Sequence, residues 1–288
     1  MADWPLVGDG QTSTYYNATP DATVGGTVVQ NSSGFVHTKS LYSTIAASTA
    51  YDAAGIYIDI VAGVGSIRSL IDIAVGTAGA EVVVIPNIFC PSPRALQLGF
   101  TVYFPISIPA GSRIAARLQS STVVPSSSNV GISVRLQGVG LNPSPPRSIV
   151  QAIGILSSGQ TGSTRYSGAP TANGLGAMTV LSTAASAGAA DRPAYPIEEV
   201  ILGLASENPA WSGTPNRQLL TIYVGEVGFE TPVLSNLPMV EHPNPDQWQT
   251  PYIGPFPCHI PAGSAISVTV QSSTGSSPTK NIALYGIS

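Results

Sequence analysis

Charged side chains are scarce in this chain of 288 residues. Asp, Glu, Lys and Arg together make up 9% of the sequence, compared with about 25% in an average globular domain. The polar surface must therefore consist mainly of Ser, Thr, Asn and Gln, which is unusual for a cytosolic enzyme. The net charge of −4 provides no basic field for nucleic acid, so we expect no nucleic-acid partner.

Cysteine and histidine are also rare, which argues against a metal centre. The two cysteines, Cys90 and Cys258, do not form a disulfide framework and predict two buried thiols, consistent with assembly in a reducing cytoplasm. None of the three histidines has a second ligand at metal-binding spacing; they are His37, His242 and His259. We expect no metal and no cofactor.

Motifs of enzyme active sites are missing as well. The chain has no G-x-S-x-G nucleophile elbow and no complete phosphate-binding glycine loop. Asp52, Asp59 and Asp72 could be the carboxylates of a polysaccharide hydrolase. That mechanism depends on the distance between two carboxyl groups, which a sequence does not give. We expect a protein that is not an enzyme and has no catalytic residues.

Long apolar runs and helical periodicity are nearly absent. No run reaches the roughly 18–20 residues that cross a bilayer, and residues 1–5 do not resemble a secretory signal. We therefore expect no membrane insertion. Short runs of period two, such as residues 56–60, are separated by turns containing Gly and Pro. This pattern predicts an all-β protein built from antiparallel β-sandwiches of the jelly-roll type.

One segment occurs twice and organises the chain. Ile108-Pro109-Ala110-Gly111-Ser112 begins an alternating run, and Ile260-Pro261-Ala262-Gly263-Ser264 begins a similar run 152 positions later. Self-similarity of this kind predicts two tandem copies of one folding unit. In each copy proline fixes φ and glycine takes a positive φ, so the same turn is expected at Pro109, Gly111, Pro261 and Gly263.

A second repeated block is the bend Gly76-x-x-Gly79-x-Glu81, which returns as Gly225-x-x-Gly228-x-Glu230. An acid beside a tight glycine bend most simply accepts hydrogen bonds from the backbone amides of the bend. We assign this structural role to Glu81 and Glu230. Calcium binding is the alternative for the pair.

The repeats divide the chain into two domains of ordinary size. We expect an irregular N-terminal arm over residues 1–25, a sandwich over 26–141, a linker over 142–147 and a second sandwich over 148–288. Three of the first five linker residues are prolines, which have no amide proton to offer a central strand.

The two copies differ most in their arginines. By the repeat offsets, Arg113, Arg117 and Arg135 of the first copy become Ala265, Thr269 and Ala283 in the second. Period two places Arg113 and Arg117 on the outward face of one strand, and we expect Arg135 on a neighbouring strand. This face is either an ordinary solvated surface or a contact with an acidic protein partner, because arginine favours bidentate carboxylate pairing.

Residues 239–257 are rich in proline and aromatic side chains and have a shorter counterpart in the first copy. Aromatic, proline-rich loops anchor interfaces or stack on sugars, although packing against the parent domain explains them equally well. Trp248 and Tyr252 are the candidates for partner contact in this stretch.

The order of these motifs resembles that of particle proteins of tailed bacteriophages. The motifs are structural: Leu70-Ile71-Asp72-Ile73, the Gly76 bend, Asn87-Ile88, Phe104-Pro105 and residues 108–117. The resemblance implies a non-enzymatic virion component with other virion proteins as partners. An adaptor of this kind is expected to be a homo-oligomer, assembled in the host cytoplasm. It would be a capsid decoration (cement) protein or a tail accessory subunit.

A carbohydrate- or receptor-binding module of a tail fibre or spike is the alternative. It would bind a host-surface glycan through loops of the second copy around Trp211 and Trp248. Specific binding on a glycan array distinguishes this hypothesis from a structural role in the particle.

If Arg117 contacts an acidic partner, Arg117→Glu abolishes assembly because it reverses the charge, and it leaves the fold intact. Co-purification with the assembled partner measures the first effect, and circular dichroism measures the second. Unchanged binding of the variant would end the hypothesis.

Overall fold

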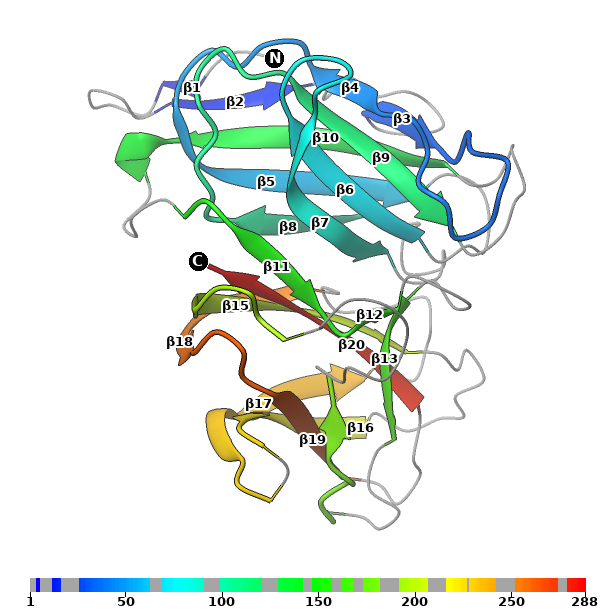
Figure 1. The fold of residues 1–288 in the computed structure, drawn as a ribbon, viewed down its shortest axis with the longest axis vertical. Helices are drawn as coiled ribbons and strands as arrows, with labels where there is room; N and C mark the ends of the chain where they lie inside the picture. Colours follow the sequence, from blue (N-terminus) through cyan, green and yellow to red (C-terminus); the bar gives the residue numbers. More distant parts are fainter. Residues whose placement is uncertain are drawn as a thin grey trace. The chain divides into compact units, whose positions relative to one another are not determined.

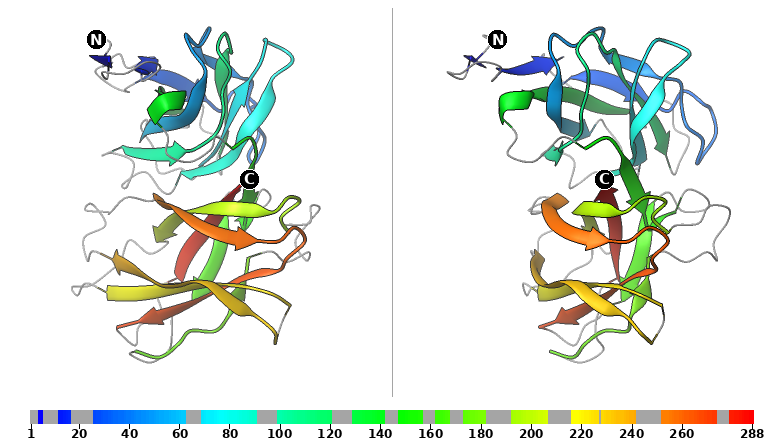
Figure 2. Two further views of the ribbon diagram at one scale, coloured as in Figure 1. Left: turned by 90° about the vertical axis from the view of Figure 1, so that its left-hand side faces the viewer. Right: turned by 60° about the vertical axis from the view of Figure 1, so that its left-hand side comes forward.

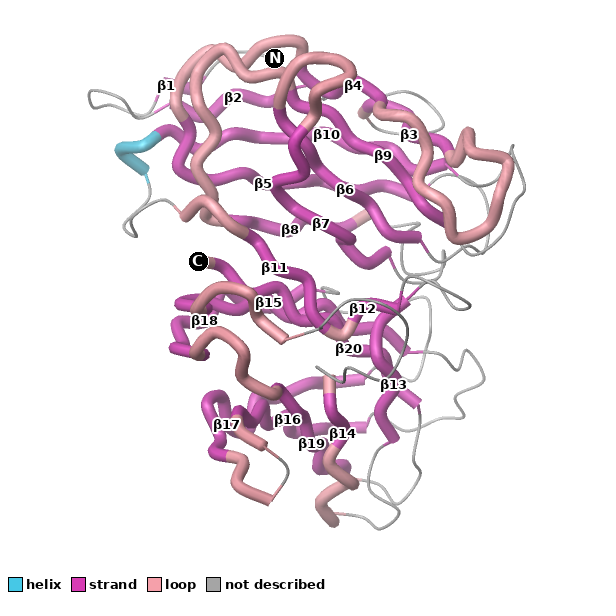
Figure 3. Tube along the Cα trace, viewed as in Figure 1, coloured by secondary structure: helices cyan, strands magenta, loops and turns pink. Residues whose placement is uncertain are grey.

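The computed structural model describes the chain over residues 4–5, 12–16, 26–62, 69–90, 99–120, 129–141, 147–156, 162–167, 173–181, 192–206, 216–226, 228–241, 252–273 and 279–288. These residues form strands and loops, with one short helical turn, η1 (Val139–Leu141) (Figure 3). No helix in this part of the chain has the length and apolar character of a membrane span.

The chain divides into two compact units, with most of the first in residues 1–150 and most of the second in residues 151–286. Most of the predicted arm and residues 142–146 of the predicted linker lie outside the described residues, so the predicted domain boundaries stay predictions. One described piece of the arm is a strand, which pairs with the first unit and begins at Thr12.

The first unit contains two sheets (Figure 1). The four-stranded sheet has the order β4 (Ser43–Ala46), β9 (Ile114–Ser120), β6 (Ser69–Val75) and β7 (Val82–Cys90). The six-stranded sheet has the order β1 (Trp4–Pro5), β2 (Thr12–Tyr16), β10 (Asn129–Gly138), β5 (Ala53–Ala62) and β8 (Phe100–Phe104), and β3 (Thr27–Gln30) also pairs with β10.

The second unit is built in the same way, and Figure 2 shows its two layers. Its four-stranded sheet has the order β14 (Thr179–Val180), β19 (Ile266–Ser272), β16 (Asn216–Val224) and β17 (Thr231–Glu241). Its six-stranded sheet has the order β12 (Ile155–Leu156), β13 (Gly162–Ser167), β20 (Thr279–Ile287), β15 (Ile197–Ser206) and β18 (Tyr252–Ile260), and β11 (Val150–Ile153) also pairs with β20.

The strand order confirms the predicted fold class of two tandem, internally duplicated antiparallel β-sandwiches. The order β4-β9-β6-β7 repeats as β14-β19-β16-β17, and β10-β5-β8 repeats as β20-β15-β18. The repeated segment holds the same place in both units, because residues 108–112 lead into β9 and residues 260–264 lead into β19.

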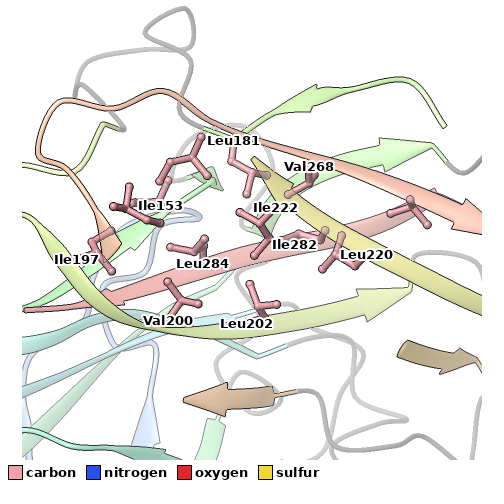
Figure 4. Packing of buried hydrophobic residues seen from close by; sticks show 13 residues of the cluster. Ile153, Leu181, Ile197, Val200, Leu202, Leu220, Ile222, Val268, Ile282 and Leu284 are labelled. Atoms are coloured by element: carbon pink, nitrogen blue, oxygen red, sulfur yellow. The ribbon is translucent and has the colours of Figure 1, made fainter. Parts of the chain in front are cut away.

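Period-two alternation builds the core of each unit. In β5, Ile56, Ile58 and Ile60 are buried, whereas Tyr57 and Asp59 between them are partly exposed. In the second unit, apolar side chains of β15 and β20 meet those of β16 and β19 (Figure 4): Val200, Leu202, Ile282 and Leu284 on one side, and Leu220, Ile222 and Val268 on the other. Each such burial stabilises the fold by about 1.5–3 kcal/mol before conformational entropy is counted.

The repeated turns also match in backbone geometry. Gly111 and Gly263 have φ values of 76° and 75°, as the Pro-Ala-Gly pattern predicts. Asn87 and Asn236 both adopt the left-handed conformation, with φ values of 52° and 56°. Asparagine tolerates this region better than most residues, which accounts for the same residue type in both copies.

The Gly76 bend offers a test of this turn geometry. Gly76 has φ +122°, and a Cβ there would lie 2.8 Å from the carbonyl oxygen of Ala80, whereas Gly79 has φ +85° and open space around it. Gly79→Ala should therefore cost only the left-handed penalty of about 1–2 kcal/mol, and Gly76→Ala should cost about 1–3 kcal/mol more because of the clash. Urea unfolding of the two variants measures the difference, and equal losses would contradict it.

Candidate functional site

The outer face of the four-stranded sheet in the first unit carries two groups of ionic side chains. We call it the charged face and define it by Lys39, Asp72, Glu81, Asn87, Arg113 and Arg117. Asp72 is on β6, Asn87 is on β7 and Arg117 is on β9, while Lys39 comes from the segment that joins β3 to β4. The charged face therefore links three strands with the loops that precede β4, β7 and β9.

Asp72 is the centre of the first group and is only 3% exposed. Its Oδ1 lies 2.8 Å from Lys39 Nζ, its Oδ2 lies 2.8 Å from Arg117 Nε, and the Asn87 amide donates to Oδ1 over 2.8 Å. Lys39 Nζ also donates to Asn87 Oδ1 at 2.8 Å. A buried carboxylate with two cations and a backbone donor has its negative charge compensated, which is the condition for keeping it ionised inside a protein.

The side chain of Lys39 is mostly covered, and this affects its protonation. Burial lowers the pKa of Lys39 from its ordinary value, although the Asp72 carboxylate favours the charged form. The ammonium group is held in place by Asp72 and Asn87. Removing the acid would leave a covered cation without its compensating charge.

A second ion pair occupies the end of the same face. Arg113 Nη1 lies 2.8 Å from Glu81 Oε1, and Arg113 Nε donates to Thr44 Oγ1 over 3.0 Å. Glu81 Oε2 accepts from the Gly79 amide at 2.8 Å. Hydrogen bonds from its own amide and that of Gly79, together with the Arg113 guanidinium, hold the pKa of Glu81 below its ordinary value against the effect of burial.

The corresponding acid of the second unit makes the same backbone contact. Glu230 Oε2 accepts from the Gly228 amide at 2.8 Å, although alanine replaces the arginine at position 265. The hydrogen bond to the glycine bend therefore belongs to the shared scaffold, and the ion pair with arginine belongs to the first unit.

The structure places the three arginines in two different environments. Arg113 and Arg117 share one outward face, as the sequence predicts, but the carboxylates that they contact belong to the same chain. Arg135 was expected on a neighbouring strand; it lies on β10 in the other sheet, where its guanidinium carbon is 3.9 Å from the centre of the Tyr57 ring. Repeat offsets align positions between copies but do not say which strands pair, so the sequence could not separate Arg135 from the other two.

Backbone contacts align the second unit with the charged face residue by residue. The Asn173 amide bonds to Ser272 O at 2.7 Å, as the His37 amide bonds to Ser120 O at 2.9 Å. This alignment places Leu175 where the first unit has Lys39. The repeat offsets place uncharged residues at three other positions, Thr221 for Asp72, Ala265 for Arg113 and Thr269 for Arg117.

Thr221 keeps one function of the acid it replaces. Its Oγ1 accepts from the Asn236 amide at 3.2 Å, as Asp72 accepts from the Asn87 amide. The left-handed asparagine is thus anchored in both units, whereas the cations are present in one.

The second unit consequently presents an outer face of a different kind. Six described positions of this sheet carry uncharged side chains: Leu175, Met178, Leu219, Thr221, Thr269 and Gln271. Leu175 and Leu219 both pair with Gln271, from opposite sides, so these three side chains form a row across the sheet. Leu175, Met178 and Leu219 are 63%, 40% and 37% exposed.

The remaining predicted site residues do not come together in one place. Trp211, Trp248 and His242 lie outside the described residues. The Tyr252 hydroxyl is 3.3 Å from that of Tyr285, so Tyr252 packs within its own unit. His259 lies 3.2 Å from Glu198 at the surface.

The three acids of the hydrolase hypothesis are held in separate places. Asp52 accepts from the Ala110 amide at 2.7 Å, Asp59 accepts from the Thr101 hydroxyl on the six-stranded sheet, and Asp72 belongs to the charged face of the other sheet. They do not converge as a catalytic pair requires.

Cys90 is buried as predicted, whereas Cys258, also predicted to be buried, is only partly buried. Burial raises the pKa of the Cys90 thiol, and it raises that of Cys258 to about 11, so both resist conversion to reactive thiolates. Among the described residues, no group of three or more His, Cys, Asp or Glu side chains could hold a metal ion.

No protein-family model and no curated protein matches this chain. Among solved structures, the STIV MCP is 11% identical, with a TM-score of 0.35 over 91% of this chain and 94% of that one. The infectious bursal disease virus Gx strain structure is 12% identical, with a TM-score of 0.26 over 99% and 70%. The CBM22-1–CBM22-2 tandem domain of Paenibacillus barcinonensis Xyn10C is 10% identical, with a TM-score of 0.26 over 86% and 82%. At these TM-scores we base no functional conclusion on the likenesses.

Replacing residues of the charged face with their equivalents from the second unit tests how the ion pairs contribute to stability. Asp72→Thr should destabilise the protein by about 3 kcal/mol, because breaking a buried ion pair leaves an uncompensated charge. The triple variant Lys39→Leu/Asp72→Thr/Arg117→Thr reproduces the set of the second unit and should return to within about 1 kcal/mol of the original stability. Urea unfolding measures the stability of both variants. A triple variant no more stable than the single one would contradict the expectation that the uncharged set can replace the ionic one.

The ion pair between Asp72 and Arg117 also affects the expected outcome of Arg117→Glu. The substitution would place a second carboxylate opposite the buried Asp72, with which Arg117 pairs in register. A loss of assembly in that variant would therefore not separate binding from folding.

Proposed function

We propose that this protein is a non-enzymatic structural component of a virus particle, a capsid decoration or tail accessory subunit that bridges neighbouring particle proteins. The observation that carries the proposal is the contrast between scaffold and surface. The two units share strand order, turn geometry and buried apolar positions, whereas the ionic residues around Asp72 in the first unit have uncharged residues at the equivalent positions of the second. Two rigid units with different surfaces are suited to holding two different neighbours.

The composition supports a structural role. With charged residues at 9% of the sequence, most of the surface is uncharged and polar, so little charge has to be desolvated when two such surfaces meet. Five of the described carboxylates accept hydrogen bonds from the protein's own donors: Asp52, Asp59, Asp72, Glu81 and Glu230. These side chains hold turns and strands, which is a structural task.

The arginine hypothesis takes a revised form within this proposal. Arg113 and Arg117 are held by Glu81 and Asp72, so a partner would meet a fixed array of donors rather than free cations. Such an array is suited to polar neighbours, since its geometry is set before binding.

Quantification of the chain in purified particles tests the proposal. We expect a fixed number of copies per particle, hundreds for a capsid subunit and a dozen or fewer for a tail subunit. A variant chain that lacks residues 1–150 should not join the particle. Absence of the chain from intact particles would overturn the proposal, and specific binding on a glycan array would favour a receptor-binding module.

A further inference from the structure

A β-bulge in the first unit brings an amine, an amide and an acid together. The register of β6 with β7 shifts between Ile71 and Ile73, so that two residues of β7 lie opposite Asp72 alone. Asn87 is one of these two residues and has a left-handed backbone with φ 52°. Bulges re-aim side chains out of the regular ladder, and here the Asn87 amide donates to Asp72 Oδ1 at 2.8 Å.

Lys39 reaches the bulge from the segment that joins β3 to β4. Its Nζ lies 2.8 Å from Asp72 Oδ1 and 2.8 Å from Asn87 Oδ1. A carbonyl bond is about 1.2 Å long, so Nζ lies within about 4 Å of Cγ of Asn87. Reacting atoms are poised for attack at about 3–3.5 Å, so a small movement of the flexible lysine side chain brings its nitrogen to that carbon.

The surroundings favour the neutral amine that such an attack needs. Burial lowers the pKa of Lys39, and the Arg117 guanidinium acts in the same direction, against the effect of the Asp72 carboxylate. Lysine becomes nucleophilic when desolvation or a nearby cation lowers its pKa. Arg117 also fixes Asp72 through Oδ2, which leaves Oδ1 beside the amine as a proton acceptor.

The second unit keeps the bulge without the other two groups. The register of β16 with β17 shifts at the equivalent place, and Asn236 is left-handed like Asn87. Leu175 and Thr221 stand where the first unit has the amine and the acid. The shared backbone therefore accounts for the asparagine, whereas it does not account for the lysine and the acid beside it.

We propose that Lys39 and Asn87 form an amide (isopeptide) bond within one chain, with Asp72 transferring the protons. The lone pair of Nζ attacks Cγ of Asn87, a bond forms between these two atoms, and the bond from Cγ to Nδ2 breaks. Two protons leave Nζ during the reaction. Asp72 Oδ1 passes both to the departing nitrogen, which leaves as ammonium. The reaction needs no oxidant or other co-reactant and takes place once in each molecule.

The bond closes the chain between residues 39 and 87. A cross-link of this kind restricts the unfolded chain as a disulfide does, and it requires no cysteine. The inference goes beyond the proposed function and does not rest on it, because the reaction involves a single copy of the chain.

The intact mass of the full recombinant chain under denaturing conditions tests the proposal. Allowing for removal of Met1, the chain should be lighter than its sequence mass by one ammonia. Trypsin should not cleave after an amidated Lys39, while it still cleaves after Arg68 and Arg94. The digest should therefore contain residues 1–68 joined to residues 69–94. A chain with the full sequence mass would overturn the proposal.

Three variants assign the bond to its groups. Lys39→Arg keeps a cation beside Asp72 but has no reactive amine, and Asn87→Gly removes the amide while glycine tolerates the left-handed backbone. Asp72→Thr leaves both reacting groups in place and removes the proton acceptor. None of the three should lose ammonia, whereas Lys280→Arg, at the other lysine of the chain, should lose it as the unmodified chain does.

Thermal unfolding provides a second measurement. Lys39→Arg should unfold at a lower temperature than the unmodified chain, because its unfolded state is not cross-linked. This variant retains an ion pair without the bond, so it is the reference for the urea comparison of the charged-face variants. A loss of ammonia that persists in Lys39→Arg would overturn the proposal. If the unmodified chain has its full mass but is found in particles at a fixed copy number, the bond is refuted and the proposed function stands.

Discussion

The antiparallel pairing of β6 with β9, repeated as β16 with β19, is the constraint on which both units depend. In each unit this pairing sends one set of side chains to the core and the alternate set outward. Ile71 opposite Leu118 and Leu220 opposite Val270 are inward pairs, and Asp72 opposite Arg117 is an outward pair. A shift by one residue would exchange the two sets, so the register protects the core and the outer face together.

The sequence predicted the fold well because the relevant signals are local or repeated. Period two in residues such as Ile56, Ile58 and Ile60 reports which face of a strand is buried, and the matched turns at Gly111 and Gly263 report a second copy of the same unit. Both signals depend on residue type and spacing alone. The all-β class and the duplication follow from them directly.

The arrangement of the outer faces could not be predicted in the same way. Arg117 and Asp72 are far apart in the chain, and only strand pairing places them side by side. The sequence did not indicate that Lys39 contacts Asp72, because Lys39 lies in a loop and loops have no periodic pattern that predicts their course. Arg135 was misplaced for the related reason that neighbouring strands in sequence, β9 and β10, belong to different sheets. The aromatic candidate Trp248 lies outside the described residues, so its role stays a prediction.

The ionic centre at Asp72 has a consequence for how two similar units fold from one chain. Tandem repeats can exchange strands during folding, because each strand has a close relative elsewhere. Pairing β6 with β19 would bury Asp72 opposite Thr269 with no arginine, and pairing β16 with β9 would leave Arg117 opposite Thr221 with no acid. The differing outer residues thus favour the native strand pairs, because the exchanged pairs leave a charge without its counterion.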